Sequence, residues 1–242
     1  MGPPEPSLQA ERIAPFQYSR TEYFVPCILG GMATPKTARL SGRQAQAARN
    51  DQLILEAARE VFTADPEAPI AAVAERAGVG ISALYRRYRG KEELLQQLSL
   101  DGLRRYIAEA EAALADDGDP WAAFVAFMRR ALDADTHSLT LHLAGTFTPT
   151  EAHWREGEHA ALLTRRLLER TRAAGALRPD FEVGDVSLVF EQLAAINVGG
   201  AERSNQLRHR YLALFLTALR VEAPPLPGPP PTWEEIRDRW AK

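Results

Sequence analysis

The chain has 242 residues, of which 45% are hydrophobic and 25% are charged, and this composition excludes a disordered protein. A single cysteine, Cys27, excludes an intrachain disulfide framework and any thiolate-rich metal site, and it fits a reducing cytosol. No run approaches the roughly 18 to 20 apolar residues that a membrane helix needs, and the first residues lack the basic-then-apolar order of a secretory signal. We therefore expect a cytoplasmic protein with no membrane partner.

The formal net charge of −3 is distributed unevenly. Residues 32–91 hold 10 basic and 6 acidic side chains, whereas residues 92–242 hold 17 and 23. A positive segment joined to an acidic one is typical of a polyanion-binding domain linked to a second domain with a different function. Ordinary solvated surfaces can also carry such a charge. Residues 1–32 mix proline, glycine and scattered aromatics without periodicity, and we expect a disordered upstream extension with Met32 as the natural initiator.

Apolar residues recur with helical spacing along the rest of the chain. The expected helices cover residues 53–62, 69–77, 81–89, 91–115, 120–132, 150–174, 183–198, 206–221 and 233–242, with a less regular segment at 139–147. Asp119 and Pro120 form a helix start, and a proline-rich linker begins at residue 223. No segment alternates with a period of two, so the prediction is an all-α fold.

The second and third helices are short and are separated by a turn that contains glycine. This arrangement lets one helix brace the DNA backbone while the next enters a major groove. Arg86, Arg87 and Arg89 could meet phosphates or a guanine edge there. The alternative is a solvated basic face, with Tyr85 and Tyr88 as packing aromatics.

Residues 74–95 resemble the signature of the TetR family of one-component transcriptional regulators. The resemblance rests on the turn Ala77-Gly78-Val79, on Leu84-Tyr85 with Tyr88 three residues later, and on Lys91-Glu92-Glu93-Leu94 opening the fourth helix. Two departures are Gly80, where a Ser or Thr cap is frequent, and the connection 65–69, which lacks the usual glycine. Glycine in place of a capping side chain costs only a few tenths of a kcal/mol.

The resemblance implies roles for individual residues. Ile81, Ser82 and Arg86 would face base edges, while Leu84 and Tyr88 would form the inner face. Tyr85, Arg87 and Lys91 would contact phosphates. A basic N-terminal arm with Lys36, Arg39, Arg43 and Arg49 could add phosphate or minor-groove contacts, and a solubilising tail is the alternative.

The expected architecture is an N-terminal three-helix helix-turn-helix DNA-binding domain and a C-terminal helical bundle for ligand binding and dimerisation. The expected boundaries are 33–95 for the first, with its basic arm, 96–222 for the second, and 223–242 for the linker and terminal helix. The resemblance implies a repressor that binds a palindromic double-stranded operator as a homodimer and is released by a small-molecule effector. Apolar positions on the last two long helices would form the dimer interface, or would simply be buried core: Val186, Leu188, Val189, Leu193, Ile196, Val198, Leu212, Leu214, Phe215, Leu216 and Leu219.

Aromatic and polar residues of the C-terminal part are candidates for an apolar effector pocket, with ordinary core packing as the alternative. They are Trp121, Phe124, Phe127, Met128, His142, Phe147, Trp154 and Phe190. The histidines lack the i, i+4 spacing of a chelating pair, and no nucleophile or phosphate-loop motif is present, so we expect no metal, no cofactor and no enzyme activity. The alternatives are a helical scaffold that binds partners without specific DNA binding, and a helical enzyme without a readable motif.

Overall fold

The computed structural model describes residues 42–134, 146–220 and 224–238, and every regular element in these ranges is an α-helix. The predicted all-α fold is therefore confirmed. All described residues belong to one compact unit, Leu40–Lys242. The helices are α1 (Gly42–Ala64), α2 (Ile70–Ala77), α3 (Ile81–Arg87), α4 (Lys91–Ala115), α5 (Pro120–Asp133), α7 (Glu151–Ala173), α8 (Val183–Ala194), α9 (Ala201–Arg220) and α10 (Trp233–Asp238).

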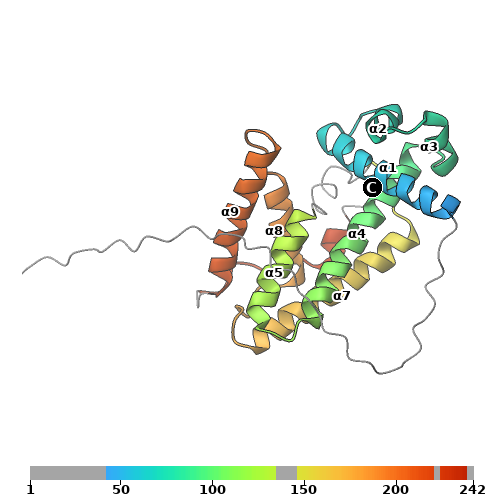
Figure 1. Cartoon of the computed structure of the whole chain (residues 1–242). Coiled ribbons are helices and arrows are strands. Elements are labelled where there is room, and N and C mark those ends of the chain that lie inside the picture. The colour runs from blue at the N-terminus through green and yellow to red at the C-terminus, as the bar shows by residue number, and fades with distance from the viewer. Residues whose placement is uncertain (1–41, 135–145, 221–223, 239–242) are drawn as a thin grey trace, which may run out of the picture. The chain divides into compact units, whose positions relative to one another are not determined.

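The first three helices and the start of α4 enclose one hydrophobic cluster, which we call the head cluster (Figure 1). Phe62 on α1, Val73 on α2 and Leu84 on α3 are each 0% exposed, so all three helices are anchored in the same core. The other buried members are Ile54, Ala57, Ala58, Ala68, Ile70, Ala74, Tyr88, Leu94, Leu95, Leu98 and Phe147.

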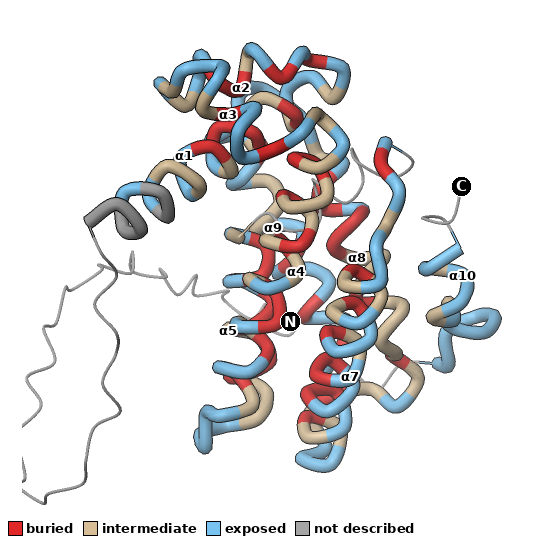
Figure 2. Tube along the Cα trace, turned by 90° about the vertical axis from the view of Figure 1, so that its right-hand side faces the viewer, coloured by how far each residue is buried: buried red, intermediate tan, exposed pale blue. Residues whose placement is uncertain are grey.

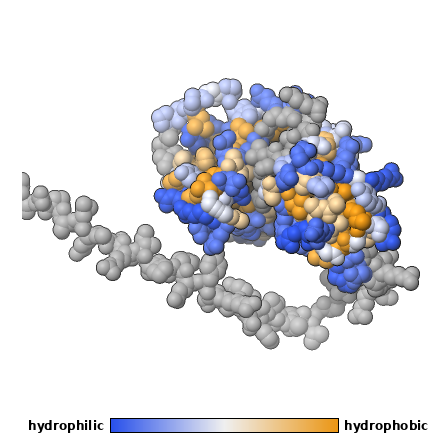
Figure 3. Space-filling model, turned by 90° about the horizontal axis from the view of Figure 1, so that it is seen from above, coloured by the Kyte–Doolittle hydropathy of each residue, from blue (hydrophilic) through white to orange (hydrophobic). Residues whose placement is uncertain are grey.

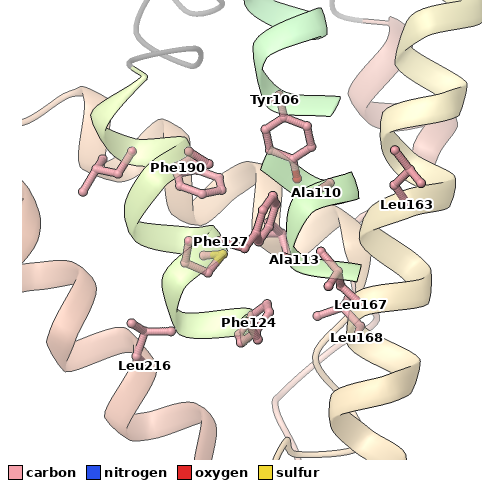
Figure 4. Packing of buried hydrophobic residues seen from close by; sticks show 14 of the residues in the cluster. Tyr106, Ala110, Ala113, Phe124, Phe127, Leu163, Leu167, Leu168, Phe190 and Leu216 are labelled. Carbon is pink, nitrogen blue, oxygen red and sulfur yellow. The ribbon is translucent and has the colours of Figure 1, made fainter. Parts of the chain in front are cut away.

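The remaining long helices enclose a second cluster, the body cluster, to which α4, α5, α7, α8 and α9 contribute (Figure 2). Its aromatic centre is formed by Tyr106, Phe127 and Phe190, whose side chains point toward one another from three helices (Figure 4). The ring of Tyr106 meets Phe127 at 5.3 Å and Phe190 at 6.4 Å between centroids, both in edge-on geometry, which favours aromatic pairs. The Tyr106 hydroxyl lies 2.8 Å from the Thr164 hydroxyl, and burial raises the pKa of Tyr106 to about 12.

Helix α4 connects the two clusters. Leu94 and Leu98 on its first turns belong to the head cluster, whereas Tyr106 and Ala110 belong to the body cluster. The helix packs extensively along α7 (Figure 1). A change in the packing of α4 in the body therefore reaches the head through one continuous helix.

Several helix ends differ from the sequence prediction. Helix α1 begins at Gly42, well before the apolar face at Leu53, because no helix breaker intervenes and Gln46 and Asn50 are joined by an i, i+4 hydrogen bond of 3.0 Å. Arg49 therefore lies on a helix and not on an extended arm.

The other differences have local causes. Helix α3 ends at Arg87, two residues early, because Tyr88 turns to an extended backbone and buries its side chain. Helix α8 ends at Ala194 and not at residue 198, and α9 begins at Ala201, because Gly199 adopts a φ of 73° between them. The predicted cap of α5 is present, since the Asp119 side chain accepts the Ala122 amide at 2.9 Å.

Candidate nucleic-acid interface

A three-residue turn, Gly78–Gly80, joins α2 to α3. Gly78 has a φ of 66°, in the left-handed region that glycine adopts without the steric penalty of a Cβ. The amides of Gly78 and Val79 donate to the carbonyl oxygens of Glu75 and Ala74, at 3.1 and 3.0 Å, and these bonds end α2. A Cβ at Gly78 would meet nothing within 4 Å, so the backbone conformation favours glycine here. Two short helices joined by such a turn form a helix-turn-helix.

Helix α3 has one buried face and one exposed face. Leu84 and Tyr88 are 0% and 2% exposed and attach α3 to the head cluster, as predicted for the inner face. The opposite face exposes Ile81, Ser82, Tyr85 and Arg86 to solvent, including 42% of Ile81 and 51% of Tyr85. Apolar, hydroxyl and guanidinium groups are the kinds that contact thymine methyls, phosphates and guanine edges in a major groove.

Comparison with known proteins supports this geometry. Residues 54–98 match the family model described as bacterial regulatory proteins, tetR family. The crystal structure of a TetR transcription regulatory protein from Mycobacterium vanbaalenii is 27% identical and has a TM-score of 0.54, covering 74% of this chain and 99% of that chain. Residues 54–98 therefore form a DNA-binding domain of the TetR type. This match supports a DNA-binding helix-turn-helix and a role in transcription regulation.

Further TetR structures share the fold at lower identity. A TetR transcriptional regulator from Streptomyces coelicolor is 24% identical with a TM-score of 0.54, covering 72% of this chain and 99% of its own. The TetR-like regulator LfrR from Mycobacterium smegmatis, solved in complex with proflavine, is 20% identical with a TM-score of 0.55, covering 74% and 99%. No curated protein matches this sequence.

The structure places Arg87, a predicted phosphate contact, in an ion pair. Its Nε donates to both carboxylate oxygens of Asp51 on α1, at 2.8 Å each, and this hydrogen bond raises the pKa of Arg87. The guanidinium also lies 5.3 Å from the ring centre of Tyr88. An acidic side chain of α1 thus competes with any phosphate for this arginine in the TetR head. Sequence reasoning missed Asp51, because spacing alone does not show which face of α1 meets the end of α3.

Lys91, the other predicted phosphate contact at the start of α4, is half-buried. Its Nζ donates to the Pro66 carbonyl oxygen at 2.8 Å and lies 5.2 Å from the ring centre of Phe62. The Lys91 side chain therefore stabilises the connection between α1 and α2, in addition to any phosphate that it contacts. Lys36 and Arg39 and the side chain of Arg43 lie outside the described part of the chain.

We expect Asp51→Asn to raise the affinity of the TetR head for DNA of any sequence. The substitution removes a negative charge and releases Arg87, so one further phosphate contact should steepen the salt dependence by about 0.9 in log–log slope. The exposed pair stabilises the fold by no more than about 1 kcal/mol, so thermal stability should change little. Fluorescence anisotropy at several salt concentrations measures the slope.

Glu60→Gln is the matched control for this experiment. It removes the same charge from α1 and releases Arg76 of α2, whose guanidinium lies 2.5 Å from the Glu60 carboxylate, and leaves the pair of Asp51 with Arg87 intact. Equal gains from both substitutions would contradict a specific competition for Arg87.

The loop before α7 attaches the body to the head. Phe147 is 5% exposed and packs in the head cluster, although it was a candidate for the effector pocket. The Gln96 side chain on α4 donates to the Thr148 carbonyl oxygen at 2.9 Å. The His153 Nε2 lies 3.0 Å from the Gln96 carbonyl oxygen, and its Nδ1 accepts the Thr150 amide at 3.1 Å. Burial lowers the pKa of His153, which favours the neutral ring that this pair of hydrogen bonds requires.

A second attachment joins α1 to the end of α5. Arg59 is largely buried and donates to the Ala134 carbonyl oxygen at 3.0 Å and to the Asp101 carboxylate at 3.1 Å. Arg59 was not among the predicted site residues, because its role depends on a contact between segments 75 residues apart.

Four of the eight candidate effector-pocket residues lie in the body cluster. Phe124, Phe127 and Met128 are 0% exposed and Phe190 is 1% exposed. Trp121 is partly buried against the same cluster and stacks with Arg220 at 5.1 Å, and Trp154 is half-buried on α7. His142 lies outside the described residues.

Helix α9 presents an apolar face that is exposed among the described residues. Leu214 is 58% exposed, Tyr211 47% and Phe215 38%, and Val198 before the helix is 56% exposed. Seen from above, the described surface is mostly hydrophilic and carries several separate hydrophobic patches (Figure 3). Five of the residues considered for dimerisation are instead buried in the body cluster, namely Val186, Leu193, Leu212, Leu216 and Leu219.

No three His, Cys, Asp or Glu side chains gather in the described part of the chain where they could hold a metal ion. None of the helices in the described ranges has an apolar stretch long enough to cross a bilayer.

Proposed function

We propose that this chain is a ligand-responsive repressor that acts in the cytoplasm and binds a palindromic operator as a homodimer. The observation that carries the proposal is the exposed face of α3, where Ile81, Ser82, Tyr85 and Arg86 stand clear of the head core. The part of the sequence that contains α3, residues 32–91, holds 10 basic and 6 acidic residues, and this charge favours binding to a polyanion.

The apolar face of α9 supports dimerisation. Leu214, Tyr211 and Phe215 give the helix an exposed stripe that a second copy can bury. A two-fold dimer presents two recognition helices about 34 to 36 Å apart, which is one turn of DNA, and hence selects an operator with two inverted half-sites.

The packing of α4 supports release by an effector. A small molecule that enters the body cluster must displace side chains around Tyr106 and Phe127, and α4 passes from there into the head. Such coupling requires that the effector bind one arrangement of the body more tightly than the other. The complex of LfrR with proflavine is a case of a TetR-like protein that holds a small molecule.

The test is fluorescence anisotropy of the protein with DNA from upstream of its own gene and with a scrambled fragment, at two salt concentrations. We expect preferential binding of the upstream fragment at near-physiological salt. Equal, weak binding of both fragments that salt abolishes would contradict operator recognition and favour a helical partner-binding protein.

A further inference from the structure

The C-terminal segment 224–238 packs back onto the body although its first part is rich in proline. Pro231 lies against Gly184 on α8, and Trp233 at the start of α10 lies against Gly157 on α7. Pro229, Pro230 and Ile236 line a surface hollow of about 400 Å³ together with Leu188 of α8. The segment therefore touches two helices that both contribute to the body cluster.

Polar contacts fix the beginning of the segment. Arg178 is 9% exposed at its side chain, pairs with Asp180, and donates to the Pro224 carbonyl oxygen at 3.0 Å. The Asp180 carboxylate accepts the Leu226 amide at 2.7 Å. The Arg178 guanidinium and this amide hold the pKa of Asp180 well below its usual range, so the contact persists at mildly acidic pH.

Two glycines make room for the segment. A Cβ at Gly184 would lie 2.7 Å from Pro231 Cγ and still closer to the Pro231 carbonyl oxygen, where no real Cβ fits. A Cβ at Gly157 would lie 3.2 Å from the Trp233 ring. Gly157 lies inside α7, where alanine is intrinsically preferred by about 1 kcal/mol, and Gly184 lies in the first turn of α8. Close approach of the segment is the physical reason for glycine at both positions.

We propose that residues 224–238 form an intramolecular strap that holds α7 against α8 and thereby fixes the contact between α7 and the head. Gly157, where Trp233 sits, is one helical turn after His153, which bonds to the Gln96 carbonyl oxygen of α4. Releasing the strap frees the start of α7 and broadens the orientations that α4 and the head adopt. Because only part of that population fits the operator, apparent DNA affinity falls. This last step rests on the proposed function.

The experiment compares hydrogen exchange in the full chain and in two variants that release the strap at different points. Gly184→Ala places a methyl group where Pro231 lies, and Trp233→Ala removes the indole ring that lies against α7. We expect the Leu226 amide to exchange about tenfold faster or more in both variants, and amides near residues 153–160 to lose protection, because local opening exposes them. Gly184→Ala is favourable for the helix itself, so faster exchange there would come from the lost contact and not from a weakened α8.

Glu234→Ala is the control, because Glu234 is the exposed neighbour of Trp233. Unchanged exchange at Leu226 in both variants would show that the strap is not docked as described. Faster exchange at Leu226 with unchanged protection near residues 153–160 would show that the segment restrains nothing, and would overturn the proposal.

Operator binding of the same variants tests the functional step. We expect at least about fivefold weaker binding, the lower end of typical coupling between sites. Equal operator affinity of the released variants and the unchanged chain would overturn the link to the head. If the unchanged chain binds no operator, the proposed function fails, whereas the exchange results still decide whether the strap exists.

Discussion

Replacing Phe127 by alanine is expected to lower the free energy of unfolding by about 3 to 5 kcal/mol. The ring is 0% exposed and meets Tyr106 edge-on at 5.3 Å, so the substitution removes buried apolar surface and an aromatic pair and leaves a cavity in the body cluster. Urea denaturation followed by circular dichroism, extrapolated linearly to zero denaturant, measures the loss.

Tyr85→Ala is the matched control, because this aromatic is 51% exposed on α3 and its truncation should change stability by no more than about 0.5 kcal/mol. The comparison also separates two interpretations of Phe127, which the sequence allowed as core or as effector contact. A loss as small as the control's, together with a lost thermal shift on effector binding, would place the ring in a ligand cavity and contradict its core role.

The head could be predicted from the sequence because its determinants are local. The turn at Gly78, the buried positions Leu84 and Tyr88 and the start of α4 at Lys91 all follow from residues within about two dozen positions. The exposed face of α3 follows from the same periodicity. Helix ends were less predictable, since the stop of α3 depends on Tyr88 turning into a core built by other helices.

The contacts of the predicted site residues could not be derived in the same way. The ion pair of Arg87 with Asp51 joins residues 36 positions apart, and the insertion of Phe147 into the head cluster joins the body loop to helices much earlier in the chain. The position of the C-terminal segment depends on glycines at 157 and 184, which in the sequence are ordinary helix residues. Such contacts arise from tertiary packing and leave no periodic signal.

These long-range contacts connect distant parts of the body to the head. Phe147 and His153 join the start of α7 to α4, and Arg59 joins α1 to the end of α5. A displacement of α5 would therefore move α1, and a displacement of α7 would move α4. If only one of these two contacts shifts, we expect the head to rotate relative to α4. In the dimer that we propose, the direction of that rotation would decide whether the two heads keep the spacing of an operator.

Replacing Arg86 by alanine is expected to weaken operator binding by about 1 to 3 kcal/mol and to relax the preference at one base pair of each half-site. Arg86 is exposed on the outer face of α3, and no salt bridge joins it to a carboxylate among the described residues, in contrast to Arg87. A guanidinium in this position can donate two hydrogen bonds to one guanine. Anisotropy titrations with the operator and with operators changed at single positions measure both effects.

Lys91→Ala and Arg76→Ala separate base contact from general charge. Lys91→Ala should weaken all sequences alike and lower the salt slope by about 1, as expected for one phosphate contact. Arg76, exposed at the end of α2 and paired with Glu60, should contribute less to both affinity and slope. Only a base contact discriminates between sequences. Equal losses for all sequences from both Arg86→Ala and Lys91→Ala would therefore mean that Arg86 contacts the DNA backbone. The base contacts would then come from Ile81, Ser82 and Tyr85.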